Sequence, residues 1–398
     1  MTHPRPSRIL PVIIVSQFAG TSLWFAGNAV LPDLQRQWGL AADVLGYVTS
    51  AVQLGFITGT LTFAFFTVAD RFSPRKVFLL CSLFGATTNL GVYVLAEGLA
   101  GLLVLRFLTG FFLAGIYPVG MKIATGWYQR GLGNALGLLV GALVVGTAFP
   151  HLLRAAGQRL PWEAVTVAVS LVALGGGLLM LWLVPDGPYL VKGTRFDPKA
   201  LAVIFRSRAF RASAFGYFGH MWELYAFWAF VPVVLAAHGA QSGAGALNVS
   251  LWAFIVIAAG AFGCAGGGVA SLRVGSAPVA FAQLAASGLC CVISPLMFHA
   301  PTPVFLAFLV FWGITVVGDS PQFSALNAQN APAGLVGSAL TIANCIGFAI
   351  TIFSIQLLNV LAQGLSADYL FLALAIGPLL GLLALRPILR PARAYGTP

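Results

Sequence analysis

Long apolar segments separated by short polar connections recur along all 398 residues of the chain. A helix that crosses a bilayer needs about 20 mostly apolar residues, and twelve segments have this length. They cover residues 9–31, 44–68, 77–96, 100–122, 134–153, 163–184, 212–236, 249–270, 278–298, 303–327, 335–358 and 367–385. The pattern predicts an all-α membrane protein with twelve transmembrane helices.

The composition supports this prediction. Hydrophobic residues make up 59% of the chain and charged residues 8%, against about 25% charged in a soluble domain. The first segment lacks a small-residue cleavage site, so we expect a retained helix rather than a signal peptide. Five cysteines without C-x-x-C spacing fall in the predicted helices, and we expect packing roles, no metal and no cofactor. They are Cys81, Cys264, Cys290, Cys291 and Cys345.

The basic residues are distributed unequally between the two predicted sides of the membrane. With twelve crossings and a cytoplasmic N-terminus, the outer side holds only Arg36, Arg154 and Arg159. The cytoplasmic segments hold Arg5, Arg8, Arg71, Arg75, Lys76, Lys122, Arg130, Lys192, Arg195, Lys199, Arg206, Arg208, Arg211, Arg273, Arg386, Arg390 and Arg393. This asymmetry predicts cytoplasmic termini and an inner-membrane protein. The net charge of +11 then needs no nucleic-acid partner.

A long hydrophilic connection, residues 185–211, divides the chain into two halves of similar length. We expect an N-terminal six-helix bundle over residues 1–190, a cytoplasmic linker over 191–211 and a C-terminal six-helix bundle over 212–398. The stretches "ADRFSPRKV" and "SLRVGSAPV" follow the second helix of each half and place Arg71 opposite Arg273. The six-helix unit therefore occurs twice.

Two local motifs carry a family resemblance. The loop "VADRFSPRK" contains Asp70, Arg71, Arg75 and Lys76, and the fourth segment contains "LVLRFLTGFFLAG" with Arg106. Both stretches resemble signatures of the major facilitator superfamily, in which an acidic residue tethers helix ends between the second and third helices. The two glycines of the loop signature are Phe66 and Ser73 here, so this match is partial.

The resemblance implies two rocking bundles with a substrate site at their interface. It also implies that Asp70, Arg71, Arg75 and Arg106 take part in conformational gating, although Arg106 could instead anchor an anion. The fifth segment has Gly141-Ala142 where proton-driven drug exporters of this family carry Gly-Pro. The second and eighth segments lack the arginines of the nitrate carriers. Neither subgroup is favoured.

The stretch "GYFGHMWELYAFWAF" places His220 and Glu223 inside the seventh segment. An ionised carboxylate in hydrocarbon costs about 3 kcal/mol on insertion scales. Residues three apart share a helix face, which Phe227 continues, so we expect this face to line the cavity. Because burial disfavours the charged form, Glu223 could hold a proton and release it on hydration. The alternative is a packing hydrogen bond to a neighbouring helix.

In the tenth segment Asp319 precedes Pro321 by two residues. Proline cannot donate to Val317, so the helix is predicted to break or kink there. Secondary transporters often place coupling ions at broken helices, although prolines also bend helices for shape alone. We expect Asp319 to be a second proton-coupling residue, with His220 as a relay.

The first segment presents Gln17, Thr21, Trp24 and Asn28 at spacings that form one helical stripe. These residues could bind a substrate or contact the seventh helix. In the eleventh segment, Thr341 and Asn344 suggest substrate binding more weakly, because such residues are common contacts between membrane helices. The predicted substrate-binding residues are Gln17, Thr21, Trp24, Asn28, Tyr225, Phe227, Thr341 and Asn344.

Together these features predict a monomeric secondary transporter of a small organic solute, coupled to protons, with import favoured over export. Its partners are the solute, protons and the lipid bilayer. An exporter of amphipathic compounds is the alternative, given aromatic residues such as Trp24, Tyr117, Tyr225 and Trp228. A non-transporting sensor or scaffold is a remoter one. The chain lacks the motifs of an enzyme.

Overall fold

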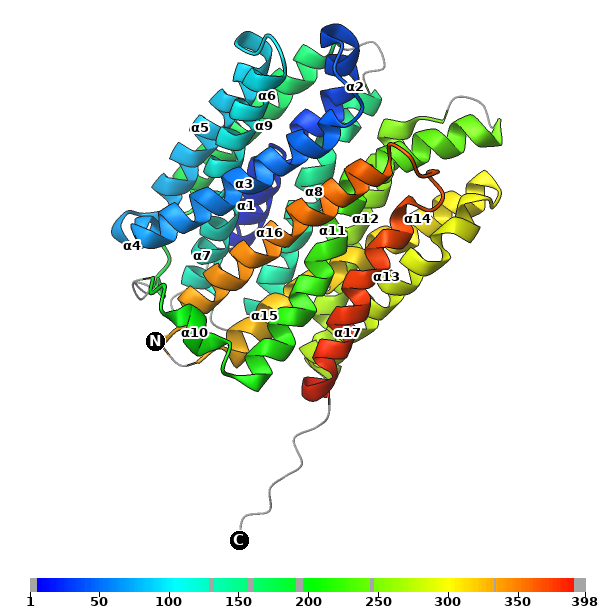
Figure 1. Ribbon diagram of the computed structural model, residues 1–398. Coiled ribbons are helices and arrows are strands. Elements are labelled where there is room, and N and C mark those ends of the chain that lie inside the picture. The colour runs from blue at the N-terminus through cyan, green and yellow to red at the C-terminus, as the bar shows by residue number, and fades with distance from the viewer. Residues whose placement is uncertain are drawn as a thin grey trace.

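The computed structural model describes residues 6–128, 132–156, 161–190, 196–243, 247–332 and 334–389. Every regular element in these ranges is a helix, and twelve helical segments are long and apolar enough to cross a membrane (Figure 1). The predicted class and the twelve spans are confirmed. Seven basic residues used for the topology lie outside the described residues, namely Arg5, Arg130, Arg159, Lys192, Arg195, Arg390 and Arg393.

The described part of the first half contains nine helices. They are α1 (Ile9–Thr21), α2 (Ala26–Trp38), α3 (Val44–Phe65), α4 (Val68–Arg71), α5 (Pro74–Val94), α6 (Leu99–Leu113), α7 (Tyr117–Trp127), α8 (Leu132–Ala156) and α9 (Trp162–Leu183). Helices α1 with α2, and α6 with α7, each form one span, and α4 is a short helix between spans.

The remaining helices follow a connection that carries the short helix α10. They are α10 (Ala200–Ile204), α11 (Arg208–Ser242), α12 (Val249–Val274), α13 (Ser276–Phe298), α14 (Thr302–Gly318), α15 (Ser320–Asn330), α16 (Val336–Leu361), the 3₁₀ helix η1 (Leu370–Ala375) and α17 (Ile376–Leu389). Helices α4 and α10 lie at one end of the molecule, here called the inner end (Figure 1). The α2–α3 connection lies at the opposite, outer end.

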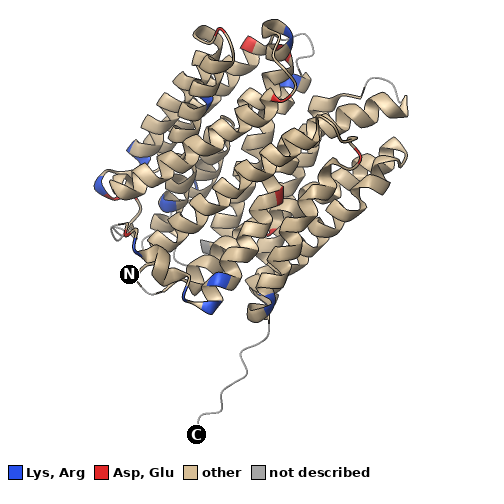
Figure 2. Ribbon diagram, viewed as in Figure 1, with Lys and Arg blue, Asp and Glu red and all other residues tan. Residues whose placement is uncertain are grey.

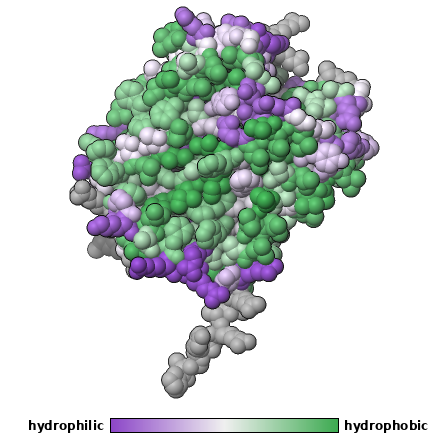
Figure 3. Space-filling view, in the orientation of Figure 1, coloured by the Kyte–Doolittle hydropathy of each residue, from purple (hydrophilic) through white to green (hydrophobic). Residues whose placement is uncertain are grey.

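The surface is that of a protein surrounded by lipid. A broad hydrophobic zone separates hydrophilic ends (Figure 3), and the lysine and arginine positions gather toward the ends (Figure 2). Large apolar side chains such as Phe262 and Phe353 are 76% and 69% exposed. Such exposure is favourable only against an apolar solvent, so this zone faces the bilayer.

The two halves repeat one helix contact. Helix α3 packs on α6 in the first half, and α12 packs on α14 in the second. A Cβ atom added to Gly110 would lie 2.1 Å from the carbonyl oxygen of Val52, and one added to Gly313 would lie 1.9 Å from that of Val256. Small residues permit such close backbone approach between membrane helices. The second and fourth spans of each half therefore pack alike.

Three spans are interrupted within the described ranges. In the tenth span, α14 ends at Gly318 and α15 begins at Ser320. The break predicted near Asp319 is therefore confirmed. The fourth span breaks between Leu113 and Tyr117, where Pro118 provides the same signal that Pro321 gives in the tenth.

The first span breaks between Thr21 and Ala26. The prediction of one continuous helix over residues 9–31 is therefore wrong. The cause is tertiary, because the nearest prolines, Pro11 and Pro32, both lie away from the break. Its freed carbonyl groups are instead bound by a side chain of another helix, as described below.

Candidate functional site

A cavity of about 630 Å³ lies between the two halves toward the inner end. It extends to Gly133 and Ser276, in the first turns of α8 and α13. Its polar side chains come from both halves. They are Thr60, Tyr117, Lys122, Thr125, Tyr217, Ser271, Ser276, Gln322, Ser324, Asn327, Gln329, Thr341 and Asn344. We refer to it as the central cavity.

Two predicted residues, Thr341 and Asn344, line the central cavity. The hydroxyl of Tyr217 donates to Asn344 Oδ1 at 2.8 Å and so joins α11 to α16. Thr60 Oγ1 and Asn327 Oδ1 are buried and have no hydrogen-bond partner among the described residues. Buried polar atoms are normally satisfied, so these two lack the partner that a buried polar atom usually has.

Aromatic rings from both halves close the central cavity on its outer side. Trp24 stacks on Phe348 with ring centroids 5.6 Å apart and lies 5.6 Å from Tyr225. The ring centroid of Phe56 lies 4.9 Å from that of Trp24 and 4.4 Å from that of Phe348. All four rings are buried. We call Trp24, Phe56, Tyr225 and Phe348 the aromatic layer.

Hydrogen bonds between α3 and α16 join the halves beyond this layer. The backbone N–H of Gly46 donates to Asn359 Oδ1 at 3.2 Å, and Gln356 Nε2 donates to Ser50 Oγ at 2.8 Å. Each bond connects one half to the other. The outer end is therefore closed, while the central cavity extends to the inner end.

Arg106 binds the interruption of the first span. Its Nη2 donates to the carbonyl oxygen of Leu23 at 3.1 Å and to that of Trp24, and its Nη1 lies 3.4 Å from Asn89 Oδ1. A broken membrane helix needs such donors for its freed carbonyl groups. Arg106 is fully buried. It thus supports the backbone that carries Trp24 into the aromatic layer, and it does not line the central cavity.

The predicted stripe of the first span is divided by the break. Gln17 packs on α7, since a Cβ atom added to Gly120 would lie 2.0 Å from Gln17 Oε1. Thr21 donates to the carbonyl of Gln17 at 2.8 Å. Asn28, beyond the break, donates to Thr49 Oγ1 at 2.7 Å. Gln17 and Thr21 therefore lie inside the N-terminal half and do not line the central cavity.

The intramembrane acids lie inside the C-terminal half. His220 Nδ1 is 2.8 Å from Asp319 Oδ1, an ion-pair distance, although their orientation is not that of a hydrogen bond. Glu223 Oε2 accepts from the thiol of Cys291 at 3.3 Å, and Glu223 Oε1 has no partner among the described residues. All three ionisable side chains are fully buried. Phe227 lies on the same face and packs against Trp312, with ring centroids 4.6 Å apart.

The face that carries His220 and Glu223 was expected to line the cavity, and this expectation is not met. The opposite side of α11 faces the N-terminal half and contributes Tyr217 to the central cavity and Tyr225 to the aromatic layer. Spacing placed His220 and Glu223 on one face, but packing decided which face it was. Their roles in proton coupling remain predictions.

The inner loop motif is organised within the N-terminal half. Asp70 and Lys122 form an ion pair that joins α4 to α7. Arg75 Nη1 donates to the carbonyl oxygen of Leu181 at 3.2 Å. Arg71 is exposed. Asp70 thus tethers the end of the fourth span, and its partner Lys122 lines the central cavity.

Several lining residues were not predicted as site residues. Lys122 was counted only as a charge for topology, and Tyr217, Gln322 and Asn327 were not singled out. The sequence could have indicated Gln322 and Asn327 as candidate lining residues, because both follow Pro321 on the helix after the predicted break. Within the described part of the chain, no group of three or more His, Cys, Asp or Glu side chains could hold a metal ion.

Comparison with known sequences identifies the family. The profile described as the Major Facilitator Superfamily matches residues 12–355. The probable galactarate/D-glucarate transporter GudP of Pseudomonas putida is 26% identical over 153 residues, 34% of this chain and 32% of that protein. The 4-hydroxybenzoate transporter PcaK of the same species is 30% identical over 188 residues, 43% of this chain and 38% of that protein. The chain therefore matches less than half the length of these relatives.

Solved structures agree in fold. The human organic anion transporter MFSD10 (TETRAN) superposes with a TM-score of 0.69 at 16% identity, over 96% of this chain and 100% of that chain. The E. coli fucose:proton symporter FucP gives a TM-score of 0.65 at 16% identity, over 97% of this chain and 100% of that chain. The chain belongs to the major facilitator superfamily.

Proposed function

We propose that the protein is a secondary transporter that moves a small organic solute across the cytoplasmic membrane by alternating access. One observation carries this proposal. The central cavity lies between the two halves, extends to the inner end, and is closed toward the outer end by the aromatic layer and the α3–α16 hydrogen bonds. Rocking of the halves, taken as residues 1–190 and 212–398, would expose the same cavity to the other side.

The proposed substrate is a small hydroxylated or aromatic organic acid. The names of the relatives support this class, since they transport galactarate or D-glucarate, 4-hydroxybenzoate and, in a D-galactonate transporter of E. coli, D-galactonate. The cavity offers the phenol of Tyr117 and the amide N–H groups of Gln322 and Asn344 as hydrogen-bond donors, and Lys122 as a cation. Such donors match carboxylate and hydroxyl oxygens.

The proposed coupling ion is the proton, with Glu223 as the main carrier and Asp319 and His220 as its partners. Asp319 lies at the break of the tenth span, three residues before Gln322 in the cavity wall. Charging or neutralising a buried ion pair changes its energy by several kcal/mol. Protonation of Asp319 can therefore bias the position of α15 without direct contact between the proton and the solute.

Reconstituted protein tests this function. Proteoliposomes with an outside pH of 6 and an inside pH of 8 should accumulate labelled D-galactonate, D-glucarate or 4-hydroxybenzoate, and a protonophore should abolish the accumulation. Import predicts uptake that follows the proton gradient. Uptake driven only by the reversed gradient would instead support the exporter alternative. Absence of flux for every acid at both gradients would argue against the proposed substrate class.

A further inference from the structure

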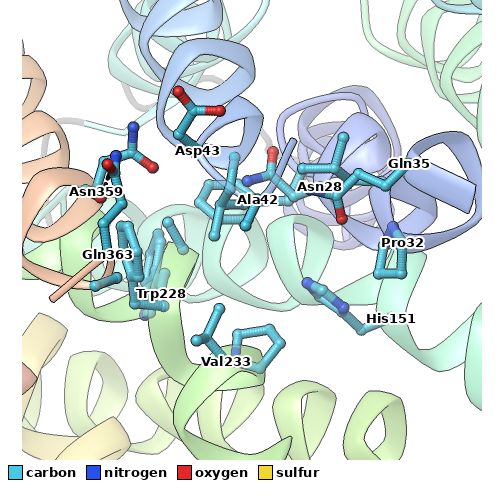
Figure 4. A pocket seen from close by; sticks show the side chains of 17 residues that line it. Asn28, Pro32, Gln35, Ala42, Asp43, His151, Trp228, Val233, Asn359 and Gln363 are labelled. Carbon is cyan, nitrogen blue, oxygen red and sulfur yellow. Dashed lines mark hydrogen bonds between the residues drawn. The ribbon is translucent and has the colours of Figure 1, made fainter. Parts of the chain in front are cut away.

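A second pocket, of about 270 Å³, lies between the halves at the outer end (Figure 4). We call it the outer pocket. One side is formed by α2 and α8, with Asn28, Pro32 and His151, and the other by Trp228 of α11 and Asn359 and Gln363. One water occupies about 30 Å³ of liquid. The outer pocket therefore has room for a small solute.

Unpartnered polar atoms in the pocket wall define the chemistry of that solute. Asn28 directs its Nδ2 to Thr49, while its Oδ1 has no partner among the described residues. Trp228 Nε1, a donor, and His151 Nε2 also lack partners there, and all three side chains are more than nine-tenths buried. The residues of the wall thus carry an unsatisfied acceptor and an unsatisfied donor. A hydroxyl group can both donate and accept a hydrogen bond at one position.

The charge of the pocket disfavours an anion. No lysine or arginine lines it among the described residues, and Asp43 contributes a carboxylate. An ammonium group would suit Asn28 and Asp43 but would leave Trp228 Nε1 unpaired. A carboxylate would suit Trp228 but would meet the charge of Asp43. A neutral solute with several hydroxyl groups can donate to Asn28 Oδ1 and accept from Trp228 Nε1 without meeting a like charge.

We propose that the outer pocket is a second binding site, for a small neutral polyol, and that its occupation holds the outer end closed. The second part rests on the proposed function, because it requires an outward-open state in which the two walls separate. A solute that contacts Asn28 or His151 from one half and Trp228 or Asn359 from the other binds only while these walls are close. Binding to one conformation shifts the population toward it.

Titration calorimetry with galactitol on the purified full chain tests the site. The variants Trp228→Phe and His151→Leu each remove one unpartnered atom and keep an apolar or aromatic side chain. Each should weaken galactitol binding by about tenfold, the effect of one lost hydrogen bond to a buried group. Asn344→Leu, in the central cavity, is the matched control and should leave galactitol binding unchanged. Thermal unfolding checks that each variant is folded.

Three results would overturn the site: no binding of galactitol to the parent, parental affinity in folded Trp228→Phe and His151→Leu, or loss of binding in Asn344→Leu alone. The last would place the polyol in the central cavity. None of these measurements depends on flux. Failure of acid transport would therefore refute the proposed function without altering the galactitol result.

A labelling experiment tests the closing effect. Ser50 at the outer end is joined to Gln356, so a Ser50→Cys variant reacts with a maleimide faster when the outer end opens. Galactitol at about ten times its dissociation constant should slow this reaction about tenfold. In calorimetry, D-galactonate should not compete with galactitol for the outer pocket. The His151→Leu background should abolish the galactitol effect. An unchanged or faster reaction in the presence of bound galactitol would refute the closing role.

Discussion

His220 and Asp319 meet in the interior of the C-terminal half, with Nδ1 and Oδ1 2.8 Å apart and both side chains fully buried. The two residues come from different spans, and Asp319 occupies the break between α14 and α15. Their contact joins the uninterrupted seventh span to the interrupted tenth span. A change in protonation at this pair therefore acts directly on a helix that lines the central cavity.

The first prediction concerns this pair. Asp319→Asn leaves a buried imidazole without its counter-ion, and breaking a buried pair costs about 3–5 kcal/mol of unfolding free energy. The double variant His220→Leu with Asp319→Asn removes both charged groups and should be closer to the parent. Thermal unfolding in detergent measures the free energy of unfolding of His220→Leu, of Asp319→Asn and of the double variant, each against the parent. Additive effects of His220→Leu and Asp319→Asn would show that the two side chains do not interact.

The second prediction concerns Glu223, whose Oε1 has no partner among the described residues. The permanently neutral Glu223→Gln should retain exchange of substrate across the membrane and lose accumulation driven by a proton gradient. Both are measured on the same proteoliposomes. Arg36→Gln, an exposed residue near the outer end, is the control. Parental accumulation in Glu223→Gln would move the proton pathway elsewhere, and Asp319→Asn would then be tested in the same way.

The third prediction concerns the Asp70–Lys122 ion pair at the inner end. Asp70→Asn should slow transport about fivefold with substrate affinity almost unchanged, because a partly exposed ion pair contributes on the order of 1 kcal/mol to one conformation. Asp186→Asn, whose carboxylate accepts from Ser73 at the same end, is the matched control. Binding by calorimetry and initial rates separate the two effects. An equal loss of affinity would indicate that freed Lys122 alters the binding site.

The fourth prediction concerns Arg106 and the carbonyl groups of Leu23 and Trp24. Arg106→Leu leaves these carbonyls unpaired and should lower the unfolding free energy by about 1.5–3 kcal/mol, the range for hydrogen bonds to a charged group. Arg36→Leu, at an exposed position, should stay within about 0.5 kcal/mol of the parent. A fully stable Arg106→Leu that nevertheless loses substrate binding would favour the anion-anchor role over support of the break.

The fifth prediction concerns closure of the outer end by Ser50 and Gln356. A disulfide between Ser50→Cys and Gln356→Cys should stop transport, because the halves could no longer separate there, while substrate binding from the inner end persists. Reduction should restore transport. Each single cysteine variant treated with the same oxidant is the control. Parental transport by the cross-linked protein would show that this end does not open.

The periodicity and composition of the sequence determined the twelve spans, because a bilayer imposes both the length and the apolar character of a spanning helix. The break at Asp319 could also be predicted from the sequence, because Pro321 removes a backbone hydrogen-bond donor at a known position. Thr341 and Asn344, which the sequence suggested as substrate-binding residues, line the central cavity, and their role in binding stays a prediction. Each of these features depends on local chemistry or on the solvent around the chain.

Tertiary structure alone decided the break of the first span and the orientation of the seventh. The break near Trp24 has no proline beside it and is bound by Arg106, which is 82 residues away in sequence. Spacing put His220 and Glu223 on one face of α11, but the partners of that face, Asp319 and Cys291, lie on other spans. A helical period fixes which side chains point together. Only the packing of the other helices fixes what they point at.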